Sequence, residues 1–139
     1  MIARRNAHKA AISLAALVIG VPFLVALAQT VAKPKAKVVE LDAAATQSRR
    51  VLAGPPDTVT MRSGYVVLQP STSVGRHSTG ANEEVVITFA GIGEMRLADG
   101  SILKLKPNVV AYCPPGTEHD VFNTGSEPLR YVYVVAKAQ

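Results

Sequence analysis

Short runs of β-branched and aromatic residues, separated by turn residues, make up most of the chain after residue 54. No stretch among them repeats apolar positions with the 3.6-residue period of an amphipathic helix. The pattern therefore predicts short β-strands, which we place at residues 58–62, 64–69, 84–90, 93–98, 101–106, 109–113, 120–124 and 129–136. Many short strands at regular spacing are typical of an all-β sandwich or barrel.

Turn and breaker residues mark the borders of this domain. The Asp-Gly pair within "ADGS" at 98–101 predicts a tight hairpin, whereas "GPP" at 54–56 interrupts any regular element. Before that break, residues 38–53 contain the runs "VVELD" and "SRRVL" and fit an edge strand or a helical turn equally well. We predict one small β-barrel domain that spans residues 38–139.

The first 37 residues follow a different pattern. The cationic stretch "MIARRNAHK" precedes the uncharged apolar run 10–28, which ends in "ALA", the small-x-small form that a signal peptidase accepts. We therefore predict a signal peptide at 1–28, a solvated linker at 29–37 and a periplasmic or secreted domain. The alternative is an uncleaved membrane anchor that leaves the domain facing the periplasm, because 23 uncharged residues separate Lys9 from Lys33.

The basic charge of the chain belongs to this leading segment. The 139-residue sequence has a net charge of +5, but from residue 38 onward it has nine Lys or Arg and ten Asp or Glu, a net charge of −1. The domain thus lacks the basic surface of a nucleic-acid-binding protein. Its single cysteine, Cys113, excludes an intramolecular disulfide. We interpret it as a small buried hydrophobe, with a metal-ligand or intermolecular role as the alternative.

The two histidines of the domain, His77 and His119, each lie in a patterned segment. In "VGRHSTGANEEVVITFAG" (74–91), the histidine is followed by two adjacent glutamates and a β-branched run that ends at a glycine. In "NVVAYCPPGTEHDVFNTG" (108–125), a strand ends at a Pro-Pro-Gly turn before the histidine. Together these segments resemble the two motifs of the cupin superfamily.

The first cupin motif is Gly, five residues, His-x-His, three or four residues, Glu, six residues and Gly. Ser71 replaces its first Gly and Thr79 its second His. The positions that agree with the motif are His77, Glu84 and Gly91. The departure at Thr79 matters because a neutral hydroxyl is a poor ligand for a transition metal.

The second cupin motif is Gly, five residues, Pro-x-Gly, two residues, His, three residues and Asn. Asn108 replaces the Gly, and the positions that agree are Pro114, Gly116, His119 and Asn123. Sixteen residues separate the two motifs, which leaves room for the one hairpin that cupins have there. We expect the Pro-Pro-Gly turn to position His119, and Asn123 to bind a neighbouring loop.

The resemblance implies a double-stranded β-helix, the cupin or jelly-roll barrel, with a metal site in its mouth and His77, Glu84 and His119 as ligands. Two imidazoles and a carboxylate suit a divalent transition metal such as iron, manganese, nickel or zinc. Because Thr79 adds no ligand, we expect three protein ligands and open positions for a small molecule. The alternative is a metal-free barrel in which the two histidines are hydrogen-bonded wall residues.

Strand alternation assigns faces to the residues around this site. His77 and Thr79 should share one face, and Glu84 should point inward while Glu83 points outward. The residues expected to share the face of Glu84 are Val86, Thr88 and Ala90. Only one of Tyr112 and Cys113 can face the pocket. Candidates for the pocket rim, for which a solvated or core position is the simpler interpretation, are Arg76, Met95 and Arg96.

Two functions of different classes fit this sequence. One is an exported metal-dependent enzyme for a small molecule, and the resemblance implies dioxygenation, decarboxylation or isomerisation; the sequence names no catalytic residue and no organic cofactor. The other is a metal-free periplasmic barrel that binds or stores a small molecule. We also expect a homodimer formed through the apolar strands 64–69 and 131–135, because pairing buries exposed strand edges.

Overall fold

The computed structural model describes residues 33–138, and all regular secondary structure in this range is β-strand. The strands are β1 (Arg49–Ala53), β2 (Arg62–Leu68), β3 (Asn82–Ala90), β4 (Gly93–Leu97), β5 (Ile102–Leu105), β6 (Val109–Cys113), β7 (His119–Asn123) and β8 (Leu129–Lys137). Within the same range, no helix is long and apolar enough to cross a membrane. The predicted signal peptide or anchor at 1–28 lies outside the described residues.

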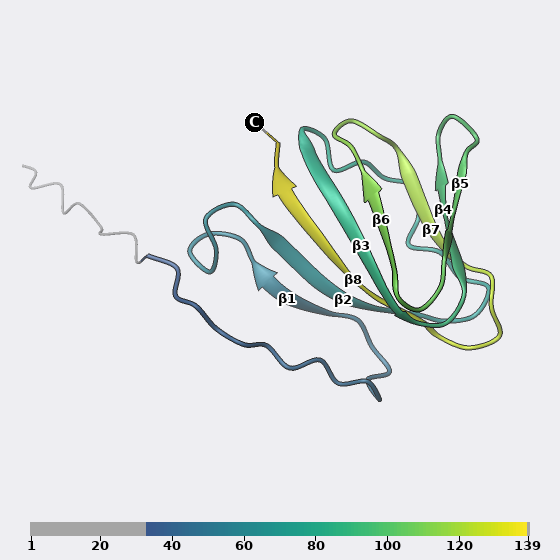
Figure 1. The fold of residues 1–139 in the computed structure, drawn as a ribbon, viewed down its shortest axis with the longest axis horizontal. Helices are drawn as coiled ribbons and strands as arrows, with labels where there is room; N and C mark the ends of the chain where they lie inside the picture. The colour runs from purple at the N-terminus through teal and green to yellow at the C-terminus, as the bar shows by residue number, and fades with distance from the viewer. Residues whose placement is uncertain (1–32, 139) are drawn as a thin grey trace, which may run out of the picture. The chain divides into compact units, whose positions relative to one another are not determined.

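The strands form two antiparallel sheets that face each other (Figure 1). One sheet has five strands in the order β1-β2-β8-β3-β6, and the other has three in the order β5-β4-β7. From β3 onward the chain crosses repeatedly between the two sheets, which is the winding of a double-stranded β-helix. The predicted all-β barrel fold is therefore confirmed for the described residues.

The main core lies between the sheets. Alternate residues of both sheets point into this space, and the buried side chains are those of Leu68, Val86, Met95, Leu105, Ala111, Cys113, Val121, Leu129 and Tyr131. β1 and β2 lie at the side of the five-stranded sheet that is far from the three-stranded sheet (Figure 1). The inner face of the five-stranded sheet is consequently packed near β3 and β6 and less covered near β1 and β2.

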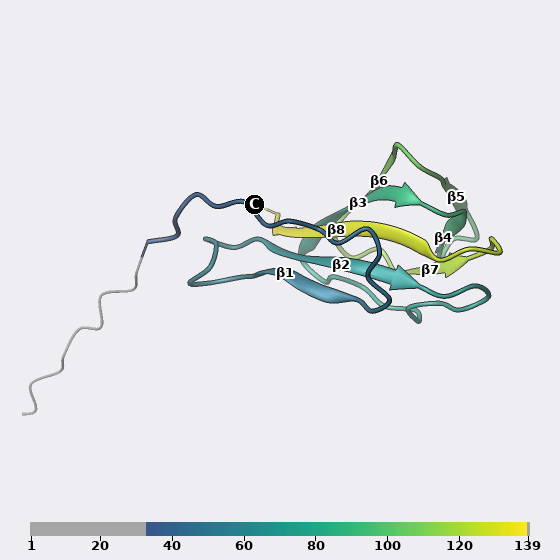
Figure 2. The ribbon, with the colours of Figure 1, turned by 90° about the horizontal axis from the view of Figure 1, so that it is seen from below.

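A second, smaller core lies on the outer face of β2 and β8. The segment 38–48 covers part of this face (Figure 2), where Leu41 and Ala45 pack against the buried side chains of Tyr65, Val67 and Val132. The Arg130 guanidinium donates a hydrogen bond to the Ala45 carbonyl (2.5 Å). These contacts attach the ambiguous segment 38–53 to the barrel, and its last residues form β1.

One predicted strand is wrong. Apart from Arg62, residues 58–62 form a loop, and Val59 and Met61 are exposed there because no other layer covers them. The remaining seven predicted strands overlap β2 to β8. The hairpin predicted at 98–101 is confirmed: it joins β4 to β5, and the Leu97 amide donates to the Ser101 carbonyl (2.9 Å).

The expected reason for dimerisation also needs correction. Strands 64–69 and 131–135 correspond to β2 and β8, and both are paired on two sides within the five-stranded sheet. They therefore present no free edge. Among the described residues, the edge strands of this sheet are β1 and β6.

Candidate metal site

Backbone pairing brings His77 and His119 side by side. His119 begins β7, and His77 lies in the irregular stretch before β3, which pairs with β7 at two isolated bridges. The His77 amide donates to the His119 carbonyl (2.9 Å), and the His119 amide donates to the His77 carbonyl (2.8 Å). Residues directly opposite each other in an antiparallel pair project to the same face. The two imidazole centres accordingly lie 4.4 Å apart.

Each imidazole is oriented by a hydrogen bond from its Nδ1 atom to a backbone carbonyl. Nδ1 of His77 lies 2.8 Å from the Gly75 oxygen, and Nδ1 of His119 lies 3.1 Å from the Thr117 oxygen. A carbonyl oxygen only accepts, so Nδ1 carries the proton in both rings. The neutral rings then present their lone pairs on Nε2, which is how such carbonyls orient histidines that bind metals.

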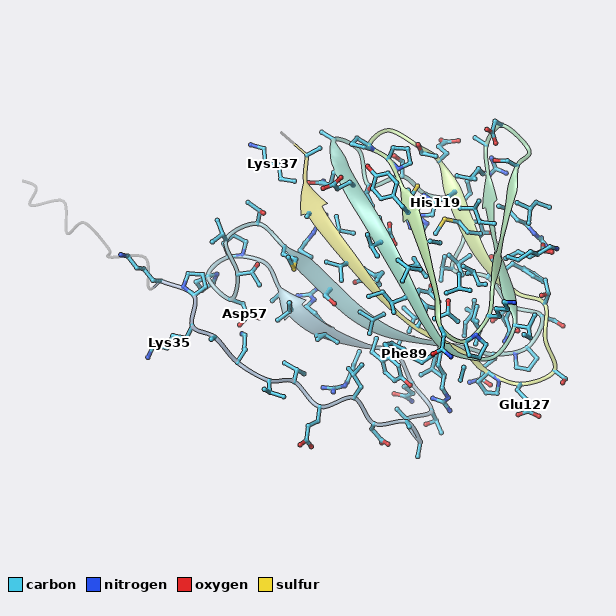
Figure 3. All side chains as sticks on the ribbon, in the orientation of Figure 1. Lys35, Asp57, Phe89, His119, Glu127 and Lys137 are labelled. Atoms are coloured by element: carbon cyan, nitrogen blue, oxygen red, sulfur yellow. The ribbon has the colours of Figure 1, made fainter. Side chains whose placement is uncertain are left out.

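Glu84 reaches the two histidines from the five-stranded sheet. Alternation along β3 turns Glu84 inward, where it is 5% exposed. Glu83 points outward, as predicted, and accepts a hydrogen bond from the exposed Tyr112 hydroxyl (3.1 Å). Glu84 Oε2 lies 3.3 Å from His119 Nε2, and Figure 3 shows His119 inside the barrel. The potential ligand atoms of His77, Glu84 and His119 all lie within 4.8 Å of one another.

This three-residue cluster fits a metal ion. Glu84 Oε2 and His119 Nε2 are buried and accept or donate no hydrogen bond among the described residues. Buried polar atoms of this kind are costly unless they are hydrogen-bonded or coordinate a metal. Two imidazole nitrogens and one carboxylate oxygen also form a donor set that suits a divalent transition metal. The geometry thus brings together the three residues that the sequence predicted as ligands.

Charge and burial define the protonation of the neighbouring groups. The Glu84 carboxylate raises the pKa of His119 above its usual value, while burial of the ring opposes this effect. Burial raises the pKa of the Cys113 thiol, and Glu84 adds to it. Cys113 is fully buried, and its Sγ lies 3.2 Å from Nδ1 of His119, the nitrogen that is not available to a metal. Cys113 is therefore the buried small residue that we expected and lies outside the cluster.

A cavity of about 460 Å³ adjoins the cluster. His77, Thr79 and Glu84 line it together with Arg50, Leu52, Ala53, Arg62, Val66, Tyr131, Tyr133 and Val135. The Thr79 hydroxyl donates to the Asn82 carbonyl (2.8 Å), which closes the turn before β3. The two arginines were absent from our sequence-based candidates, because the order of β1, β2 and β8 in the sheet brings them to the cavity.

Two motif positions keep the backbone conformation of glycine without being glycine. Ser71 and Asn108 have φ angles of 59° and 66°, and they are the only non-glycine residues with positive φ in the described part of the chain. Gly91 has φ 80°, and a Cβ there would lie 2.6 Å from the Pro128 carbonyl oxygen. Gly116, the remaining motif glycine, has φ 74°, so all four motif glycine positions are turns of the kind that favour glycine.

The family comparison agrees with this geometry. The family model described as "Cupin domain" matches residues 64–135, which is more than half of the chain. This chain belongs to the cupin family. A comparison with curated proteins finds no match.

Solved structures support the same fold. The cupin resembles a Cupin 2 conserved barrel domain protein from Salinispora arenicola, with a TM-score of 0.61 and 24% identity over 75% of this chain and 91% of that chain. The cupin domain of Cnp3 from Schizosaccharomyces pombe has a TM-score of 0.59 and 18% identity over 66% of this chain and 64% of that chain. A Klebsiella pneumoniae protein with a double-stranded β-helix domain has a TM-score of 0.58 and 19% identity over 73% of this chain and 90% of that chain. At these identities the similarity shows the fold alone.

Other sequence-predicted positions of this cupin support the barrel. Asn123 is fully buried; its amide group donates to the carbonyls of Leu68 (2.8 Å) and Glu127 (2.9 Å), and its oxygen accepts from the Gly125 amide (2.9 Å). Asn123 therefore binds neighbouring loops, as predicted. Residues 115–116 form a turn just before His119.

The three rim candidates take the simpler positions. Met95 is fully buried in the main core. Arg96 pairs with Glu94 (3.0 Å) and lies over the ring of Phe122, 4.2 Å from its centre. Arg76 is exposed beside His77 and does not line the cavity.

Proposed function

We propose that this cupin binds one divalent transition metal through His77, Glu84 and His119, and acts on a small molecule that enters the adjoining cavity. The observation that carries the proposal is the orientation of the two histidines. Both Nδ1 atoms are committed to backbone carbonyls, so both Nε2 lone pairs are free beside a buried carboxylate. Histidines that only form hydrogen bonds in the wall of a metal-free barrel would not need two free Nε2 atoms facing the same carboxylate.

The residues of the cavity limit the chemistry that follows. A bound divalent metal would supply Lewis acidity toward an oxygen atom of the small molecule. Glu84 would offset part of the metal's charge, and the three protein ligands would leave coordination positions open. Burial raises the pKa of Tyr131, so its phenol stays protonated and would orient the molecule by donating a hydrogen bond. Dioxygenation, decarboxylation and isomerisation are the reaction classes that we carry forward for this site.

The test is the metal content of the full-length chain, purified without metal-affinity resin and measured by elemental analysis. We expect about one equivalent of iron, manganese, nickel or zinc in the parent and none in His77→Ala, because two ligands alone bind weakly. Thr79→Ala is the matched control: it changes another residue of the cavity wall, and its metal content should be unchanged. Thr79→His should bind metal more tightly, because it adds the fourth ligand of the family motif.

The alternative function is a metal-free barrel that binds or stores a small molecule. Failure of the parent to retain any of these four metals, even after incubation with each ion, would favour that function and contradict the metal proposal. His119→Gln is measured as the second ligand variant beside His77→Ala. Glutamine is used because His119 is buried and its replacement by alanine would leave a cavity.

We also propose that the domain is exported and dimeric. The apolar run 10–28 supports export, with cleavage after Ala28 or retention as an anchor. Sequencing the N-terminus of the protein recovered from the periplasmic and membrane fractions distinguishes these two cases. Exposed apolar side chains on β3 and β6, those of Phe89, Val110 and Tyr112, support a dimer contact at that edge of the five-stranded sheet. Light scattering of the parent and of Val110→Lys tests it.

A further inference from the structure

Two arginines enter the cavity wall from outside the region that matches the cupin domain. Arg50 lies on β1, and Arg62 is the first residue of β2, whereas the family match begins at residue 64. Both side chains line the cavity beside Glu84. Both arginines thus come from the segment that precedes the residues matched by the family model.

Strand register places the arginines on the same face as the three-residue cluster. Arg62 is paired with Val135 of β8, and Val135 is paired in turn with Glu84 of β3. Arg50 is paired with Gly64, the next inward position on β2. Neighbouring strands are about 4.8 Å apart, so Arg62 and Glu84 are separated by about 10 Å across the sheet. A molecule with a few carbon atoms, lying over Val135, can reach both.

Neither arginine has an acidic partner among the described residues. The ion pairs found there join Lys37 to Asp57, Arg96 and Lys104 to Glu94, and His119 to Glu84. Glu84 is the one acidic residue in the described wall of the cavity, and it faces His119. The cavity therefore carries an excess of positive charge, which a divalent metal would increase. A cavity of this charge attracts an anion.

The rest of the wall suits a small organic anion. Val66 and Val135 provide apolar surface, and Tyr131 and Tyr133 provide aromatic rings with hydroxyl groups. A guanidinium presents parallel N–H donors that match the two oxygens of a carboxylate. Arginines at one end and metal ligands at the other would bind the two ends of one molecule in different ways.

We propose that the cavity is a binding site for a small organic acid, with one carboxylate held by Arg50 and Arg62 and the other end of the molecule directed toward His77, Glu84 and His119. The second part of this proposal rests on the proposed metal-dependent function. The first part does not, since the arginines are present whether or not a metal is bound.

The experiment is isothermal titration of the full-length chain with oxalate, malonate, succinate and glutarate, at constant ionic strength, in metal-free and metal-loaded forms. Succinamide, which has the shape of succinate without its charge, and inorganic phosphate are titrated in parallel. The variants are Arg50→Gln and Arg62→Gln. Arg76→Gln is the matched control, because it removes the same charge from an exposed position next to His77 but outside the cavity wall.

We expect one dicarboxylate to bind at a single site, and each cavity variant to weaken it by about tenfold or more, as expected for loss of a hydrogen bond between charged groups. Arg76→Gln should change the affinity by less than about twofold, and succinamide should not bind. Equal dicarboxylate affinity in the parent and both cavity variants would overturn the proposal. Binding of phosphate alone, or of no dicarboxylate in either form, would overturn it as well.

The two proposals can fail separately. One equivalent of metal without dicarboxylate binding would leave the metal site standing and reject the organic-acid site. Arginine-dependent dicarboxylate binding in a protein that takes up no metal would support the carboxylate subsite and reject the metal-dependent function. The thermal unfolding midpoint of each variant checks that the fold is retained.

Discussion

Val86 and Val66 point toward the same side of one sheet but have very different surroundings. Val86, on β3, is fully buried, because the three-stranded sheet covers it. Val66, on β2, is half-buried and lines the cavity. Both strands pair with β8 in regular antiparallel register through most of their length. The backbone is therefore equivalent at the two positions, and the difference lies in what packs above it.

This contrast explains where the site lies. In the covered part, most inward side chains are apolar and fill the core, with Thr88 as a buried polar exception. In the open part, the same alternation presents arginines and tyrosines to a cavity. Glu84 and His119 lie at the border between the two parts; both are buried, and Glu84 also lines the cavity. The covering layer, and not the strand pattern, separates core from site.

The largest effect should come from Asn123, on the covered side. Asn123→Ala removes three hydrogen bonds made by a fully buried side chain, one of them to the buried Leu68 carbonyl, so the free energy of unfolding should fall by about 3 kcal/mol. Urea denaturation measures it. Asn82→Ala loses one hydrogen bond, from the Asn82 side-chain amide to the Thr79 carbonyl in a part-buried turn. It should lower the free energy of unfolding by about 1 kcal/mol or less. Similar losses of unfolding free energy in the two variants would contradict the contrast between the covered and the open part of the barrel.

The two valines test it directly. Val86→Ala should lower the free energy of unfolding by about 2 kcal/mol, because a fully buried side chain is truncated. Val66→Ala truncates a half-buried side chain that packs against the main core on one side and faces the cavity on the other, and should cost about 1 kcal/mol or less. The same denaturation series provides both values. A Val66 cost equal to that of Val86 would mean that the open part of the sheet is packed in solution.

Acidification should weaken metal binding at the border. Glu84 raises the pKa of His119 above the usual value of about 6.5, so a proton competes for Nε2 already near neutral pH. Below that pKa, affinity should fall by up to about tenfold per pH unit. Acidification should have the opposite effect on the metal-free protein, because it should stabilise the fold. Its ion pair stabilises the fold fully below about pH 6.5, and this contribution is lost as pH rises through the raised pKa.

Titration with zinc and thermal unfolding between about pH 5.5 and about pH 8 measure both trends. Glu84→Gln is the control for the metal-free protein, because it removes the carboxylate that raises the pKa. A parent whose metal affinity does not change across this range would contradict the assignment of His119 as a ligand.

The smallest effect should come from Ser71, in the stretch that carries His77. Its φ of 59° is unfavourable for a residue with a side chain. Ser71→Gly should relieve that cost of about 1 kcal/mol. Glycine loses more chain entropy than serine on folding, by about 0.5 kcal/mol, so the net gain in stability should be about 0.5 kcal/mol. A small rise in the unfolding midpoint would report it. A fall would show that the serine side chain stabilises this turn.

The motif residues could be predicted from the sequence because their spacing reports local turns. Ser71, Asn108 and Gly91 mark backbone conformations, and His119 follows a turn that Pro115 and Gly116 begin. Inward alternation from Glu84 was also readable, although it ends at a register shift between Thr88 and Ala90.

Pairing between distant strands was not readable. β1 is held by a core on the outer face, formed with Tyr65 and Val132, which no local pattern announces. Val59 and Met61 alternate like strand residues but have no layer to cover. Arg50 and Arg62 meet at the cavity because β1 lies beside β2. Such positions depend on strand order, which a single sequence does not encode in its periodicity.

The absence of a side chain at Gly64 determines where the Tyr133 ring lies in the cavity wall, and so influences the size of the cavity. The Tyr133 ring lies against Gly64, and a Cβ at that position would be 2.6 Å from Cε1 of the ring. Gly64→Ala would force the ring to move, while leaving every residue of the cavity wall chemically unchanged. A single methyl group on the sheet can thus change the largest ligand that the cavity admits. One substitution can therefore change size selectivity in this barrel, at a residue that does not line the cavity.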